Sequence, residues 1–157
     1  MTPLRSVRDP GRRVVIAGGG IGAIEAALAL RAVAGDLPRI DLIAPERDFV
    51  YRAMTVAEPF GRGGTLAIPL QSLEPRLGVR HRRDAIREVD PDRGQVLLRS
   101  GEQVAYDALI VAVGARPQEW LDGALTFTRP AAVPDVRRLL EDLRAGEKSS
   151  VLFAAAP

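Results

Sequence analysis

A run of glycines directly after a short apolar segment is the feature that most restricts the fold of this chain. Arg13–Ala17 has the composition of a buried strand, and Gly-Gly-Gly-Ile-Gly-Ala follows at once at 18–23. The segment Ile24–Ala34 is rich in alanine and leucine and predicts a helix, and Ile40–Ile43 predicts a second short strand. A strand, a glycine turn, a helix and a strand in this order predict a dinucleotide-binding βαβ unit.

The residues of the glycine turn have separate expected roles. Gly18 allows the tight turn out of the strand, and Gly20 lets a pyrophosphate approach the backbone because it has no Cβ. Ala23 is small enough for close packing of the helix on the strand. The N-terminus of the following helix is expected to present free N–H groups and positive dipole charge to the phosphates, and Ile21 and Gly22 of the turn are further candidate binding residues. The alternative is a glycine-rich turn that binds nothing.

A carboxylate that binds the ribose hydroxyls is expected at the end of the second strand. The nearest candidate is Glu46, which follows the strand end at Ala44 after one proline. Two interpretations of Glu46 remain open: it accepts the ribose hydrogen bonds, or it is an ordinary acidic loop residue.

The remainder of the chain fits an α/β fold with a central parallel sheet and flanking helices. Val79–Arg82 predicts a third strand, and alternation in 85–89 and 95–99 predicts a small antiparallel β-meander. The most apolar run, Ala108–Val113, predicts a central parallel strand. The stretch Glu46–Leu77 is rich in proline and glycine and predicts a long connection with at most short helices.

Two elements are predicted near the C-terminus. Pro134–Ala145 has apolar residues at helical spacing, with proline at its start and glycine after its end. Val151–Ala156 predicts a further strand just before the chain stops. A strand edge without a neighbour would favour self-association or pairing with a complementary chain.

The composition argues against several functions. The chain has no cysteine and one histidine, His81, so we expect no disulfide, no redox dithiol and no metal site. The net charge of +2 gives no electrostatic case for nucleic acid. We interpret Arg80, Arg82 and Arg83 as a solvated face, and the alternative is a phosphate site. No apolar run approaches the roughly 20 residues of a membrane span, so a cytoplasmic protein is the default. No acid–base pair or nucleophile suggests a catalytic residue.

Three segments together resemble a known family. The matching segments are Arg13–Ala27, Leu42–Arg52 and Tyr106–Pro117. They resemble the flavoprotein disulfide-reductase superfamily, and more narrowly its branch of type II NADH dehydrogenases and sulfide:quinone oxidoreductases. The resemblance runs through essentially the whole chain. It implies a Rossmann-like FAD/NAD(P)-binding domain, FAD as cofactor, and an FAD-dependent NAD(P)H oxidoreductase.

The resemblance also implies further FAD-binding residues. Ala112 and Gly114 match the second family fingerprint, usually Ala-Thr-Gly, at a strand end beside the flavin; valine replaces the threonine here. Arg116 belongs to the matching continuation of that motif. Ala85 matches a position whose backbone faces the adenine, and Arg52 matches a segment near the isoalloxazine, although alanine follows it where the family has proline. Each of these residues also has a purely structural interpretation.

Members of this family are much longer than 157 residues. We therefore expect 1–125 to form the first segment of an FAD-binding domain, and 126–157 a connecting helix and the first strand of an incomplete NAD(P)H-binding domain. In a full-length relative, NAD(P)H would reduce FAD, which would pass electrons to a quinone or another acceptor. The isolated chain is expected not to turn over. The alternatives are a nucleotide-binding module without redox activity, or a truncated remnant that needs a partner chain.

Overall fold

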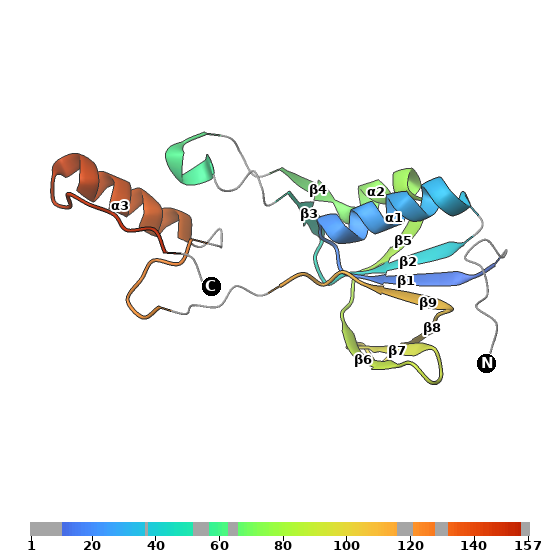
Figure 1. The fold of residues 1–157 in the computed structure, drawn as a ribbon. Coiled ribbons are helices and arrows are strands. Elements are labelled where there is room, and N and C mark those ends of the chain that lie inside the picture. Colours follow the sequence, from blue (N-terminus) through green and yellow to red (C-terminus); the bar gives the residue numbers. More distant parts are fainter. Residues whose placement is uncertain are drawn as a thin grey trace. The chain divides into compact units, whose positions relative to one another are not determined.

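A computed structural model describes residues 11–36, 38–51, 57–62, 66–115, 121–127 and 132–154 (Figure 1). The chain divides into two compact units. The first comprises Met1–Tyr51 and Ala67–Gly114, and the second comprises Arg52–Leu66 and Ala115–Pro157. Arg52 and Arg116, two of the residues expected near a flavin, lie outside the described residues.

The first unit is built on a parallel sheet of four strands in the order β5-β2-β1-β9. The strands are β1 (Arg13–Ala17), β2 (Arg39–Ile43), β5 (Val79–Arg82) and β9 (Ala108–Val111). At the carboxyl ends, Ala17 is in register with Ile43 on one side and with Val111 on the other. The predicted Rossmann-like fold class is confirmed, and the strand order reverses between β1 and β9.

Two helices cover one face of this sheet, α1 (Ile21–Ala34) and α2 (Leu70–Leu77) (Figure 1). Ala23 and Ala27 are completely buried, and their small side chains let α1 pack closely on the strands. The main apolar core lies between these helices and the sheet. Its buried members are Val14, Ile16, Ala23, Ala27, Ile40, Leu42, Ala44, Phe49, Leu70, Leu77 and Val79.

The predicted meander covers the opposite face (Figure 1). It has three antiparallel strands, β6 (Ile86–Asp90), β7 (Gln95–Leu98) and β8 (Gln103–Ala105). A second buried cluster joins it to the sheet, formed by Val15, Ile43, Val96, Leu98 and Val104. Alternation along β1 therefore sends neighbouring side chains into two different cores.

Arg82 links a buried carboxylate of the sheet to the meander. Asp41 is 6% exposed and lies 3.0 Å from Arg82 Nε and 3.5 Å from Arg13 Nε. Arg82 Nη1 also bonds Glu102 Oε1 at 2.6 Å. Burial alone lowers the pKa of Arg82, but Asp41 and Glu102 outweigh it and raise that pKa. The expectation of a solvated arginine face was therefore wrong for Arg82.

The connection between β2 and β5 contains more structure than the sequence predicted. An antiparallel pair, β3 (Asp48–Val50) and β4 (Ala67–Pro69), precedes α2. Helix α2 forms despite Pro75 in its interior, because Leu70 and Leu77 both pack into the main core. The burial of these two leucines outweighs the low helix propensity of Pro75.

Strand β9 was expected at the centre of the sheet, but it lies at an edge. Among the described residues it pairs with β1 alone, and Val111 is 66% exposed. An apolar run indicates that a strand can be buried in a parallel sheet, but it does not specify which strands lie beside it.

The second unit contains helix α3 (Val133–Ala145), close to the predicted range. Val133 and Val136 are buried, and Arg137 Nη2 donates to the Glu58 carbonyl at 3.5 Å. The strand predicted at 151–156 is not formed over 151–154, which have no regular structure, and 155–157 lie outside the described residues. The reason is physical: a strand needs a neighbour, and none of the described residues pairs with this segment. Within the described part of the chain, no helix is long and apolar enough to cross a membrane.

Candidate functional site

The candidate site lies at the carboxyl edge of the parallel sheet, where β1, β2 and β9 end. The Gly18 N–H donates to the Ile43 carbonyl at 2.8 Å, and the Ala112 N–H donates to the Ala17 carbonyl at 2.8 Å. These bonds hold the three strand ends together. In open α/β sheets, ligands bind at this edge where the strand order reverses.

Gly18 brings the two predicted motifs into contact. Its φ is +124°, a conformation that side-chain-bearing residues rarely adopt. A Cβ on Gly18 would lie 2.2 Å from the Ala112 carbonyl oxygen, so no side chain fits between them. A Cβ on Gly22 would lie 3.8 Å from the Ala112 Cβ. The glycine turn and the second fingerprint are therefore packed directly against each other.

Gly19 faces the interior of the unit. A Cβ at this position would lie 2.9 Å from Leu70 Cδ1, 3.0 Å from Ala44 Cβ and 3.7 Å from Glu46 Oε2. The Glu46 carboxylate is thus beside the glycine turn, and its residue is exposed. Gly19 had no predicted role, although it is the middle one of three consecutive glycines.

Gly20 faces open space. No heavy atom lies within 4 Å of a Cβ built there, and its extended backbone (φ −88°) suits any residue. It caps α1 without a side-chain hydrogen bond, and the first turn of that helix has no acidic residue. Its carbonyl accepts the N–H groups of Ala23 and Ile24. The preceding helical N–H groups, with the positive end of the helix dipole, suit a pyrophosphate approaching this open side.

Exposed apolar side chains lie next to this site. Ile21 is 52% exposed at the start of α1, and Val113 is 70% exposed directly after Ala112. Gly114, the second fingerprint glycine, has φ +73° and open space around it. Exposed apolar surface of this kind suits a large apolar ligand better than water.

Ala85 lies three residues after the end of β5. Its N–H already donates to Asp84 Oδ1 at 2.7 Å. Its carbonyl accepts the Arg99 N–H at 2.9 Å. The Ser100 side chain, followed by the Ala85 N–H, lowers the pKa of Asp84. The predicted adenine contact of the Ala85 backbone would therefore have to use the remaining lone pair of its carbonyl.

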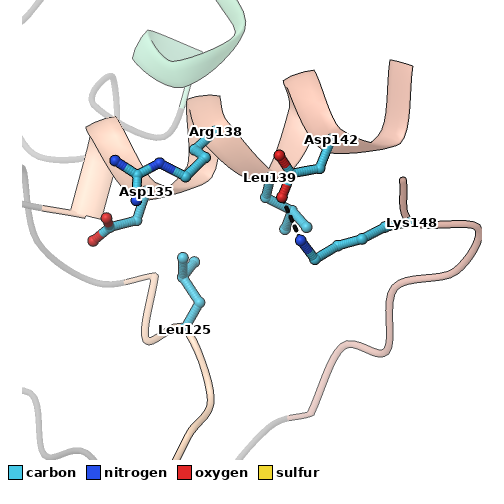
Figure 2. Close-up of a pocket in the computed structure, with 6 residues that line it drawn as sticks. All are labelled: Leu125, Asp135, Arg138, Leu139, Asp142 and Lys148. Carbon is cyan, nitrogen blue, oxygen red and sulfur yellow. Dashed lines mark hydrogen bonds and ion pairs between the residues drawn. The ribbon is translucent and has the colours of Figure 1, made fainter. Parts of the chain in front are cut away.

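A separate pocket lies in the second unit, beside α3 (Figure 2). Its lining residues are Leu125, Asp135, Arg138, Leu139, Asp142 and Lys148. The side chains of Asp142 and Lys148 form an ion pair. The turn after α3 brings the two residues together, and in it the backbone N–H of Lys148 donates to the Asp142 carbonyl at 3.3 Å. The pocket mixes both charge signs and contains none of the residues that the sequence predicted. We assign no function to it.

Comparison with known proteins agrees with this geometry. Residues 12–152 match the family model described as pyridine nucleotide-disulphide oxidoreductase. The sulfide-quinone reductase of Aquifex aeolicus (strain VF5) is 33% identical over 110 residues, which cover 67% of this chain. Ferroptosis suppressor protein 1 of Taeniopygia guttata is 30% identical over 107 residues, covering 68% of this chain.

A solved structure shows the same fold. The sulfide:quinone oxidoreductase of Aquifex aeolicus superposes with a TM-score of 0.72 and 24% identity, over 86% of this chain and 33% of its own. The matched regions span 25% and 28% of the two curated relatives. This chain thus corresponds to about a quarter to a third of each relative.

Proposed function

Because this chain belongs to the pyridine nucleotide-disulphide oxidoreductase family, we propose that it is the FAD-binding portion of an FAD-dependent oxidoreductase. The observation that carries the proposal is the open side of Gly20, at the start of α1 and beside the contact between Gly18 and Ala112. A dinucleotide phosphate needs this combination of free helix N–H groups and close backbone approach.

Different residues of the chain are proposed to bind different parts of FAD. The N–H groups of Ile21 and Gly22 would hold the pyrophosphate next to Gly20, and Glu46 would accept hydrogen bonds from the adenosine ribose. The exposed side chain of Val113 and the backbone of Gly114 would be available to the flavin. Contacts from Ala85, Arg52 and Arg116 remain predictions from the resemblance.

Bound FAD would supply two-electron redox chemistry, from NAD(P)H to a quinone or another acceptor. We place the FAD-binding segment at 1–125 and the beginning of an NAD(P)H-binding domain at 126–157. Turnover by this chain alone is not expected, since the role proposed for its residues is to bind and orient the cofactor. A partner chain and a cytoplasmic location remain predictions.

An equilibrium titration followed by flavin fluorescence tests the proposal. The purified chain is titrated with FAD and, separately, with FMN, which lacks the adenosine monophosphate half. We expect FAD to bind, ADP to compete with it, and FMN to bind much more weakly. Equal binding of FAD and FMN without competition by ADP would contradict recognition through the glycine turn. Binding of ADP without any preference for FAD would favour a nucleotide-binding module without redox activity.

A further inference from the structure

The candidate nucleotide site has a buried side behind the glycine turn. Leu70, the first residue of α2, is 0% exposed, and its Cδ1 lies 2.9 Å from the position of a Cβ on Gly19. Ala44 lies on the same side, with its Cβ 3.0 Å from that position. A side chain at Gly19 would therefore press against two buried side chains, whereas a side chain at Gly20 would enter open space.

Leu70 is also bonded to the segment that carries Glu46. Its backbone N–H donates to the Arg47 carbonyl at 3.0 Å. The pairing of β3 with β4, in which Asp48 is opposite Pro69, brings the two segments together. One residue thus contacts the phosphate-binding turn through its side chain and the ribose-binding loop through its backbone.

Ala44 is fixed from the other side by β5. Its N–H donates to the Arg82 carbonyl at 3.1 Å, and its carbonyl oxygen lies 3.2 Å from His81 Nε2. Ala44 is therefore held in place when the neighbouring packing changes. If the Leu70 side chain is shortened, the space behind Gly19 stays partly open, because a close-packed core relaxes only in part.

We propose that Leu70 is a positioning residue for the dinucleotide site. Its side chain backs the glycine turn, and its N–H holds the loop of Glu46, so that it sets the spacing between the phosphate-binding and ribose-binding groups. This inference rests on the proposed function. Leu70 itself lies behind the turn, away from the open side at Gly20, and acts on the ligand only through other residues.

The test compares Leu70→Ala with Leu77→Ala at the other end of the same helix. Leu77 is 4% exposed and belongs to the same core, but it is not among the nearest neighbours of Gly19. FAD affinity of the full chain is measured by flavin fluorescence, and urea unfolding shows that both variants are folded. We expect Leu70→Ala to weaken FAD binding about tenfold more than Leu77→Ala, which is the lower end of the effect that loss of an outer orienting partner has at metal sites. If the alanine variants unfold, Leu70→Val and Leu77→Val are compared in the same way.

A double-mutant cycle measures the coupling between Gly19 and Leu70 in FAD binding, and a general loss of stability does not produce such coupling. Gly19→Ala places a Cβ against Leu70 Cδ1, so it should weaken FAD binding in the parent chain. In the Leu70→Ala background that contact is gone and only the contact with Ala44 Cβ at 3.0 Å remains, so the same change should weaken binding less. Contacting residues are coupled in this way, whereas independent residues give additive effects.

The outcomes separate the inference from the proposed function. If the parent chain binds FAD and the two leucine variants lose affinity equally, the positioning role is overturned and the FAD proposal stands. Additive effects of Gly19→Ala and Leu70→Ala overturn the positioning role as well. If the folded parent chain binds no FAD, the proposed function is overturned, and the inference with it.

Discussion

Gly18 and Ala112 are in such close contact that a Cβ on Gly18 would lie 2.2 Å from the Ala112 carbonyl oxygen. The contact joins the end of β1 to the residue after β9, and it holds two motifs together that are far apart in the sequence. The carboxyl edge of the sheet is thereby fixed as a rigid surface at the point where the strand order reverses.

The contact predicts a high cost for a side chain at Gly18. Gly18→Ala should lower the free energy of unfolding by about 3 kcal/mol or more, since backbone strain and overpacking each cost roughly 1–3 kcal/mol. Gly101→Ala is the matched control: Gly101 also has a positive φ (+92°), but nothing lies within 4 Å of its Cβ position. Urea unfolding should show the larger loss for Gly18→Ala, and equal losses would contradict the steric argument.

Glu46 has two interpretations, which one substitution separates. Glu46→Gln keeps the shape of the side chain and removes its charge. If Glu46 binds the ribose, FAD affinity should fall about tenfold, because a hydrogen bond to a charged group contributes roughly 1.5–3 kcal/mol. Glu88→Gln, at an exposed position on β6, is the control. An unchanged affinity in a flavin fluorescence titration would make Glu46 an ordinary loop residue.

The buried ion pair predicts a stability effect far larger than that of the neighbouring arginines. Arg82→Met removes the closer partner of buried Asp41 and should cost about 3 kcal/mol, as breaking a buried pair does. Arg80→Met, at an exposed position on the same strand, should change stability by less than about 0.5 kcal/mol. Both values come from urea unfolding at neutral pH. Similar small effects would mean that Asp41 is adequately compensated by Arg13.

We expect Asp84 to make a contribution to the stability of the fold that depends on pH. Hydrogen bonding by the Ser100 side chain, joined by the Ala85 N–H, lowers the pKa of Asp84 in the folded chain. A carboxylate whose pKa is lowered on folding stabilises the fold above its unfolded pKa of about 3.9, and this contribution is lost as the pH falls through the folded pKa. Asp84→Asn should therefore reduce stability at pH 7 and flatten the dependence on pH below about 4. Unfolding curves with the same pH dependence for parent and variant would refute this role.

Local patterns predicted the elements whose signals lie in adjacent residues. The third strand was expected and observed at Val79–Arg82, and β1 likewise at Arg13–Ala17. Helix α1 begins at Ile21, before the predicted Ile24. Gly22 in its first turn has a low helix propensity, so the local composition did not indicate this earlier start.

The predictions failed where distant packing decides the structure. The sequence predicted at most short helices between β2 and β5, which the eight-residue α2 satisfies, but the antiparallel pair of β3 and β4 was not expected. In the site, the glycine turn and the second fingerprint were each recognised, but their contact through Gly18 was not. The role of Gly19 was missed for the same reason, because its neighbour Leu70 lies fifty-one residues further along the chain.

The central claim is that this chain holds FAD at its glycine turn, and the most direct test is a visible absorption spectrum. Parent chain and Gly20→Glu are each mixed with FAD, desalted and measured, and their thermal unfolding is compared. A side chain at Gly20 enters open space, so the variant should fold like the parent, while its carboxylate blocks the phosphates. The account predicts a retained flavin spectrum in the parent chain and none in the folded variant. A colourless, folded parent chain, or an equal flavin spectrum in both, would contradict it.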